Sequence, residues 1–136
     1  MSKAGAGPFP PLLRFADILF VNGVLDENGG NLKVRRVVVV TPDAALAADH
    51  PIVAAPVTTT LPPQLTADHV ALPFKNPPGT RHPKTGLTMR AAVKRTWIMT
   101  VQPHDIREYS GFVPGSSMGS VRVKTAARAR QIGGWR

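Results

Sequence analysis

The chain has 136 residues, the size of one ordinary domain, of which 43% are hydrophobic and 18% charged. This composition predicts a folded domain with a sizeable core and excludes an intrinsically disordered chain. Cysteine is absent, which excludes disulfides, thiolate nucleophiles and thiolate-bound zinc. No run of about 18 apolar residues is present, and no apolar core of signal-peptide length follows Met1, so we expect a cytoplasmic protein without a membrane partner.

Charge points to the class of partner. Lys and Arg total 17 against 8 acidic residues, which gives a net charge of +9 and a sequence pI near 11.2. Phosphate backbones bind such surfaces through the release of counterions, so a nucleic acid is the expected partner. An acidic protein partner is the alternative that charge leaves open.

The predicted elements follow in chain order. Pro8, Pro10 and Pro11 disfavour regular structure, so residues 1–13 are predicted to form a flexible N-terminal arm. Residues 44–48 predict one helical turn, and the proline-rich stretch 73–85 predicts a loop. Runs of β-favouring residues predict strands, and a closing amphipathic stretch predicts a helix; the strands are expected at 18–21, 37–40, 52–59, 70–72, 91–101 and 109–113, and the helix at 118–131.

The valine run at residues 37–40 is the clearest strand, and its unbroken β-branched character predicts burial on both faces. Strands this short do not each bury two faces unless the sheet curls. Several short strands followed by one helix therefore predict a mainly β protein, a small barrel with a C-terminal helix.

Three segments carry a resemblance to a known family. Residues 33–43 read KVRRVVVVTPD, residues 53–59 read VAAPVTT, and residues 14–21 read RFADILFV. They resemble the arginine-led valine strand, the Ala-Pro-Ile-Thr-Ser stretch and the opening Gly-Asp-Ile strand of the MazF/PemK toxins, and the resemblance extends over about residues 14–130. It implies an SH3-like β-barrel of the MazF/PemK/CcdB type over residues 14–131, followed by a tail at 132–136.

The resemblance also implies a function. MazF/PemK toxins are endoribonucleases of type II toxin–antitoxin systems, which cleave single-stranded RNA at specific sequences without a metal. It further implies a homodimer and a cognate antitoxin protein as partner. The chain departs from the family pattern at four positions: Arg36 replaces the usual Pro, Ala16 replaces Gly, and Lys94 and Thr96 stand where some members carry an Arg and an Asp.

By resemblance, Arg35 and Thr58 are the predicted catalytic residues. Metal-independent cleavage uses the RNA's own 2′-hydroxyl as nucleophile, so the enzyme positions the phosphate and stabilises its added negative charge. The planar guanidinium of an Arg holds two phosphate oxygens at once, and a Thr hydroxyl donates to a third. The alternative for each residue is structural: a solvated charge for Arg35 and a β-favouring surface residue for Thr58.

A basic stretch of the sequence predicts the RNA-binding surface, with Trp97 as a possible platform for a base or else a core residue. The stretch consists of Arg81, His82, Lys84, Arg90 and Lys94. Histidine side chains in general can gain or lose a proton near neutral pH, so His82 is a candidate acid or base, or else an exposed loop residue that only contacts RNA. The four histidines lack metal-ligand spacing and no phosphate-binding glycine motif occurs, so neither a metal nor another cofactor is expected.

Two other functions compete with the endoribonuclease. A non-catalytic SH3-like module that binds RNA or DNA also agrees with the high charge and with Lys94 and Thr96 at the acid–base positions. A gyrase poison on the same barrel is the third hypothesis, although the basic segment 128–136 shows no specialised ending.

Overall fold

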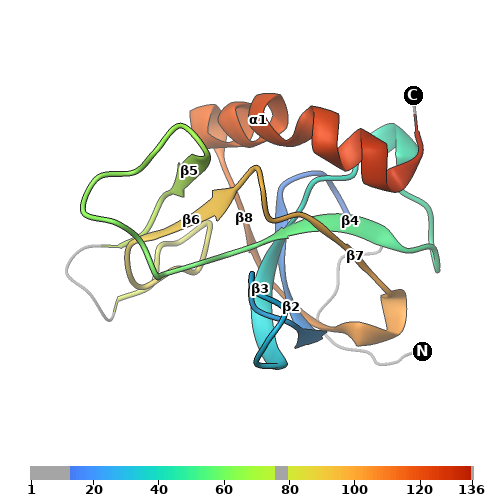
Figure 1. Cartoon of the computed structure of the whole chain (residues 1–136), viewed down its shortest axis with the longest axis horizontal. Coiled ribbons are helices and arrows are strands. Elements are labelled where there is room, and N and C mark those ends of the chain that lie inside the picture. Colours follow the sequence, from blue (N-terminus) through green and yellow to red (C-terminus); the bar gives the residue numbers. More distant parts are fainter. Residues whose placement is uncertain (1–12, 76–79, 136) are drawn as a thin grey trace.

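The computed structural model describes residues 13–75 and 80–135, and its strands are antiparallel to their neighbours. The larger sheet has the strand order β7–β4–β3–β2–β8, and β5 and β6 form a second sheet of two strands. Figure 1 shows both sheets beneath one long C-terminal helix. The elements are β2 (Asp17–Val24), β3 (Lys33–Val39), the 3₁₀ turn η1 (Asp43–Ala45), β4 (Ile52–Pro56), β5 (His69–Leu72), β6 (Ala91–Lys94), β7 (Met99–Val101), the 3₁₀ turn η2 (Pro103–Asp105), β8 (Ile106–Phe112) and the helix α1 (Gly115–Gly133).

β3 is the middle strand of the larger sheet, and the valine run explains this position. Val37, Val38 and Val39 are fully buried. Val38 belongs to the apolar cluster beneath α1, whereas Val37 and Val39 belong to a second cluster on the other face, with Leu19 of β2. The prediction of a central strand buried on both faces is therefore confirmed.

Helix α1 covers one side of the molecule and packs on β4, β5 and β7. Its buried residues Val121, Thr125 and Ala129 recur every fourth position and form one stripe. The helix ends at Gly134, whose left-handed backbone (φ 78°) lets its N–H donate to the Arg130 carbonyl at 2.8 Å. Sequence analysis had placed the helix at 118–131, so the structure lengthens it at both ends. No helix in the described ranges is both long enough and apolar enough to span a bilayer.

The predicted strand at residues 91–101 is wrong as a single element. A turn at residues 95–98 divides it into β6 and β7, which belong to different sheets. The turn is closed by hydrogen bonds from the Arg95 N–H to the Asp68 carbonyl (2.9 Å) and from the Trp97 N–H to the Lys94 carbonyl (3.1 Å). β-propensity alone did not reveal this turn, because every residue in it is compatible with a strand.

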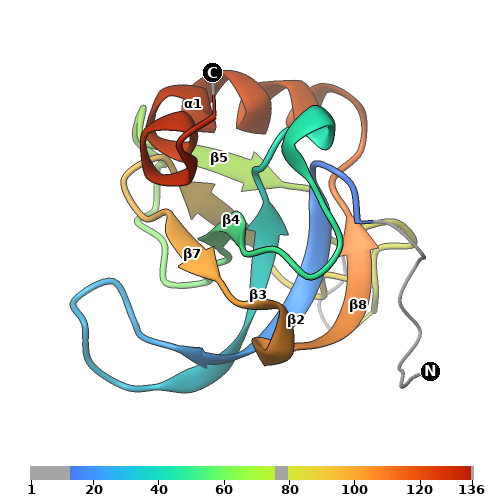
Figure 2. The same ribbon diagram turned by 90° about the vertical axis from the view of Figure 1, so that its right-hand side faces the viewer.

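The described part of the chain thus has the predicted class, mainly β with one C-terminal helix. Figure 2 shows the loop between β2 and β3 projecting from the body of the molecule, away from α1. The predicted helical turn at 44–48 is realised as η1, one position earlier. The predicted N-terminal arm lies outside the described residues, apart from residue 13.

Candidate active site

The two residues predicted as catalytic come from β3 and from the segment that follows β4: Arg35 lies within β3, and Thr58 lies two residues after the last residue of β4. β3 and β4 pair in antiparallel register, which the Val57 N–H extends by donating to the Arg36 carbonyl at 2.9 Å. Continued by one more residue on each side, the same register would set Arg35 opposite Thr58. Opposed residues in an antiparallel pair project from the same face, with Cβ atoms about 4.5–5.5 Å apart. The fold therefore brings a guanidinium and a hydroxyl to one surface.

Thr58 also joins the two sheets. Its N–H donates to the Ala92 carbonyl at 2.8 Å, and its carbonyl accepts the Ala92 N–H at 3.0 Å, as an isolated bridge to β6. Its Oγ1 accepts the Thr60 N–H at 3.1 Å, which fixes the oxygen. Within the described residues the hydroxyl proton has no acceptor. It is therefore available to a phosphoryl oxygen.

The Arg35 side chain is held from two sides. Its Nε donates to the Val24 carbonyl at 3.4 Å, and its guanidinium carbon lies 5.7 Å from the centre of the Trp97 ring. This separation is within the range of a cation–π contact. Because Nε is used, the two terminal nitrogens remain the free fork that suits phosphate oxygens. Trp97 is half-buried in the β6–β7 turn, so its role here is to support Arg35.

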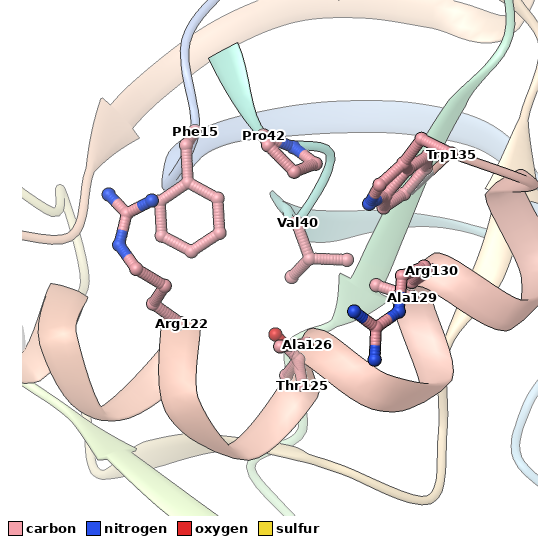
Figure 3. Close-up of a pocket in the computed structure, with 9 residues that line it drawn as sticks. All are labelled: Phe15, Val40, Pro42, Arg122, Thr125, Ala126, Ala129, Arg130 and Trp135. Atoms are coloured by element: carbon pink, nitrogen blue, oxygen red, sulfur yellow. The ribbon is translucent and has the colours of Figure 1, made fainter. Parts of the chain in front are cut away.

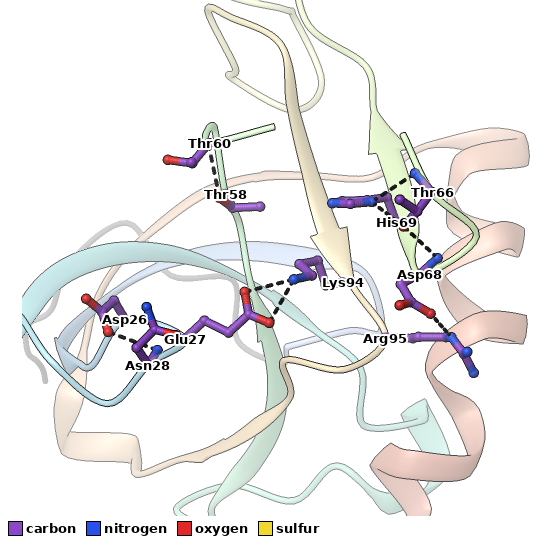
Figure 4. A network of polar contacts seen from close by, with 10 residues as sticks. All are labelled: Asp26, Glu27, Asn28, Thr58, Thr60, Thr66, Asp68, His69, Lys94 and Arg95. Carbon is purple, nitrogen blue, oxygen red and sulfur yellow. Dashed lines mark hydrogen bonds and ion pairs between the residues drawn. The ribbon is translucent and has the colours of Figure 1, made fainter. Parts of the chain in front are cut away.

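Lys94 lies on the same face, two positions along β6 from Ala92. Its ammonium contacts both carboxylate oxygens of Glu27, at 2.9 and 2.8 Å. Figure 4 shows Glu27 reaching from the β2–β3 loop to Lys94, beside Thr58. Glu27 is not among the site residues that the sequence predicts. In the structure Glu27 supplies the carboxylate of the site. Its oxygens lie at about the distance from the Lys94 ammonium at which phosphate oxygens would bind.

The loop that carries Arg81, His82 and Lys84 has its own organisation. His82 Nδ1 accepts the Lys84 N–H at 3.1 Å and the Thr85 N–H at 3.3 Å, so this nitrogen shapes the loop. The Phe112 N–H donates to the Lys84 carbonyl at 2.9 Å, which attaches the loop to β8. A Cβ at the neighbouring Gly111 would overlap this loop backbone, so glycine is required there.

Arg81 lies close enough to Arg36 for the two positive charges to interact. Burial, then the positive charge of Arg81, lowers the pKa of Arg36 from its usual value, while Glu108 opposes the shift. The Arg36 guanidinium stacks on the Phe20 ring at 4.6 Å. Consecutive residues of a strand point to opposite faces, so Arg36 projects away from the face of Arg35.

The predicted RNA-binding residues thus separate into groups. Lys94 joins Arg35 and Thr58, whereas Arg81, His82 and Lys84 lie on the loop against β8. Arg90 binds elsewhere, since its guanidinium donates to the carbonyls of Pro62 and Pro63 at 3.0 and 3.3 Å. Across residues 13–75 and 80–135, no three His, Asp or Glu side chains are grouped as metal ligands.

Comparison with known proteins identifies the fold. No protein-family model matches the chain, and no curated protein matches it. Solved structures do: MazF (Form-I) from Deinococcus radiodurans superposes with a TM-score of 0.62 at 17% identity, covering 88% of this chain and 97% of that one. The Mycobacterium tuberculosis toxin MazF-mt6 gives a TM-score of 0.59 at 19% identity, covering 85% and 97%. An endoribonuclease from a mycobacterial species, solved in complex with its cognate antitoxin, gives 0.60 at 14% identity, covering 85% and 92%.

These neighbours are MazF-type endoribonuclease toxins, and this chain has their fold over most of its length. The predicted resemblance is confirmed at the level of fold.

Proposed function

We propose that this chain is a metal-independent, sequence-specific endoribonuclease toxin that cleaves single-stranded RNA, including messenger RNA, through attack of the RNA's own 2′-hydroxyl. One observation supports the proposal: the antiparallel register of β3 and β4, which the Val57 N–H to Arg36 carbonyl bond extends, would set Arg35 opposite Thr58 when continued by one residue. The fork of Arg35 stabilises the charge that the phosphate gains in the transition state, and the Thr58 hydroxyl orients a phosphoryl oxygen. The MazF fold and the net charge of +9 support the same substrate.

The expected partners rest on the family resemblance and on the same comparison. We expect a homodimer on the basis of the family resemblance. We also expect an antitoxin that silences the cleavage, because a structural neighbour is solved with its cognate antitoxin. Sedimentation of the purified chain at micromolar concentration checks the first expectation, and a monomer would contradict it. Loss of cleavage on addition of the antitoxin encoded beside the gene checks the second.

The experiment for the activity incubates the pure protein with a diverse single-stranded RNA pool in excess EDTA. Cleavage is expected to leave a 2′,3′-cyclic phosphate, because the attacking group belongs to the RNA. An oligonucleotide with 2′-deoxy at the scissile position is the control and stays intact. Cleavage of that control, or no cleavage of the pool, contradicts the proposal.

The second candidate is a non-catalytic RNA-binding module, and the Glu27–Lys94 pair favours it. In this arrangement the Glu27 carboxylate pairs with the Lys94 ammonium, which would otherwise contact the phosphate. Such a module would bind single-stranded RNA with strong salt dependence and leave every member of the pool uncut.

A further inference from the structure

A separate cavity lies beneath α1, at the opposite end of β3 from the candidate active site. It has a volume of about 200 Å³. Figure 3 shows it between Phe15 and Arg122 on one side and Trp135 and Arg130 on the other, with Val40 in the middle. Val40 is five positions along the strand from Arg35, which separates the two sites by about 16 Å.

The wall formed by Trp135 depends on the glycines before it. Gly134 adopts a left-handed backbone (φ 78°), which turns the chain back over the helix end. A Cβ at Gly133 would overlap the Trp135 ring, so the ring lies directly against this glycine. The sequence Gly133-Gly134-Trp135 therefore forms one side of the cavity.

The interior of the cavity is apolar, and its rim is cationic. Val40, Pro42 and Ala129 supply apolar surface, and the hydroxyl of Thr125 already donates to the Val121 carbonyl at 2.6 Å. Arg122 stacks on the Phe15 ring, with its guanidinium carbon 4.2 Å from the centroid.

Neither Arg122 nor Arg130 forms an ion pair within the described ranges, where the three pairs are Lys94–Glu27, Arg95–Asp68 and His104–Asp105. α1 carries no acidic residue along its whole length. The two guanidinium groups at the mouth of this apolar cavity therefore have no acidic partner within the described residues.

Charge and polarity indicate which kind of ligand fits this cavity. A second copy of this chain carries +9, and residues 1–12 contain Lys3 but no acid, so neither neutralises the rim. A nucleobase presents several donors and acceptors at its edge, and burying them without partners is unfavourable. An apolar side chain flanked by carboxylates meets both requirements, because it fills the interior and pairs with the rim.

We propose that this cavity binds an acidic segment of a partner protein, with one apolar side chain inside and carboxylates on Arg122 and Arg130. The site is independent of the proposed cleavage, because it shares no residue with the face of Arg35 and Thr58. Peptide and RNA are therefore expected to bind at the same time.

The test is calorimetric titration of the full chain with the hexapeptide EDLFDE and with its uncharged counterpart QNLFNQ. Saturable binding of the acidic peptide is expected, with at least tenfold weaker binding of the neutral one. Ala126→Leu fills the cavity and should weaken binding about tenfold. Ala127→Leu, on the same helix but outside the lining, is the matched control and should bind normally.

Charge reversal provides the second arm. Arg122→Glu should weaken binding about tenfold, whereas Arg128→Glu makes the same charge change outside the cavity and should weaken it only slightly. Thermal melting confirms that each variant is folded, and a saturating 2′-O-methyl RNA oligonucleotide should leave peptide affinity unchanged. Equal effects of the paired variants, competition by the RNA, or no saturable peptide binding would overturn the proposal.

Discussion

An arginine lies against an aromatic ring near each end of β3, Arg35 from the strand itself and Arg122 from α1, but the two have different surroundings. At one end Arg35 stacks on Trp97, with the Thr58 hydroxyl opposite and the Glu27–Lys94 pair beside it. At the other end Arg122 stacks on Phe15 over an apolar cavity. A guanidinium held beside polar hydrogen-bonding groups is suited to bind a phosphate. A guanidinium beside an apolar cavity is suited to bind a segment that combines carboxylates with an apolar side chain. Net charge does not distinguish them; the neighbours of each cation do.

The largest expected effect separates the two arginines directly. Arg35→Ala should lower RNA cleavage by about 100- to 1,000-fold, the scale of losing one preorganised donor to transition-state charge. Arg35→Lys should restore little, because a point charge lacks the bidentate fork. Arg122→Ala removes another arginine that lies against an aromatic ring, near the other end of β3, and should cleave normally. Initial rates on one RNA substrate measure all three, and equal losses in Arg35→Ala and Arg122→Ala would show that the rate responds to general charge.

Thr58→Val is expected to have the next largest effect. The change keeps the shape and the backbone bridge to Ala92 but removes the hydroxyl, so cleavage should fall about tenfold or more while RNA affinity stays near normal. Thr59→Val is the control, because this exposed neighbour points to the other face. If affinity and rate fall together in Thr58→Val, the hydroxyl acts in ground-state binding and not in the chemical step.

The sequence predicted some parts of this comparison and not others. The valine run predicted the central strand, which the structure confirms, because local pattern carries that information. The order of the motifs suggested Arg35 and Thr58 as the catalytic pair, and that assignment stays a prediction. The turn at residues 95–98 was missed, since strand propensity does not reveal where a chain changes sheets. That turn is what places Trp97 under Arg35.

Glu27 was missed for a different physical reason. It lies in a polar loop without periodicity, and its partner Lys94 is 67 positions away in the sequence. The five predicted RNA-binding residues are neighbours in sequence, but the alternation of side chains along strands and the attachment of the loop to β8 distribute them. The cavity beneath α1 has no sequence signal, because its lining comes from the segment before β2, the segment after β3, the helix α1 and the residue Trp135 that follows the helix.

The Glu27–Lys94 pair allows a smaller effect to be measured. Glu27→Gln frees the Lys94 ammonium to contact RNA, so affinity for a 2′-O-methyl oligonucleotide should rise a few-fold at low salt. The salt dependence of the affinity should also become steeper, by the release of about one more counterion. Asp68→Asn frees Arg95 with the same charge change away from the site and should alter affinity less. Weaker binding of Glu27→Gln would show that the carboxylate organises the loop for RNA and does not screen Lys94.

The smallest expected effect concerns stability and contrasts two acids. Asp17 begins β2 near the cavity, and burial raises its pKa above the usual 3.8, although the Arg14 N–H donates to it at 2.7 Å. A raised folded pKa means that the folded state disfavours the carboxylate, so stability from this group is lost as pH rises from the unfolded pKa through the folded one. An amide at this position would keep an acceptor for the Arg14 N–H without the charge. The melting temperature of Asp17→Asn minus that of the natural chain should therefore increase between pH 4 and pH 7.

Asp68 should show the opposite sign. Its hydrogen bond with Arg95 lowers its pKa, so its contribution to stability is present above the unfolded pKa and is lost as pH falls through the folded one. The melting temperature of Asp68→Asn should then fall further below that of the natural chain as pH rises over the same range. The change should be small because the Asp68–Arg95 pair is exposed. Thermal melts of the natural chain, Asp17→Asn and Asp68→Asn at each pH give both differences in melting temperature. The titration of all other groups affects each protein alike and cancels in these differences. If the two differences follow pH with the same sign, burial is not what distinguishes Asp17 at the cavity end of the sheet from the paired acids elsewhere.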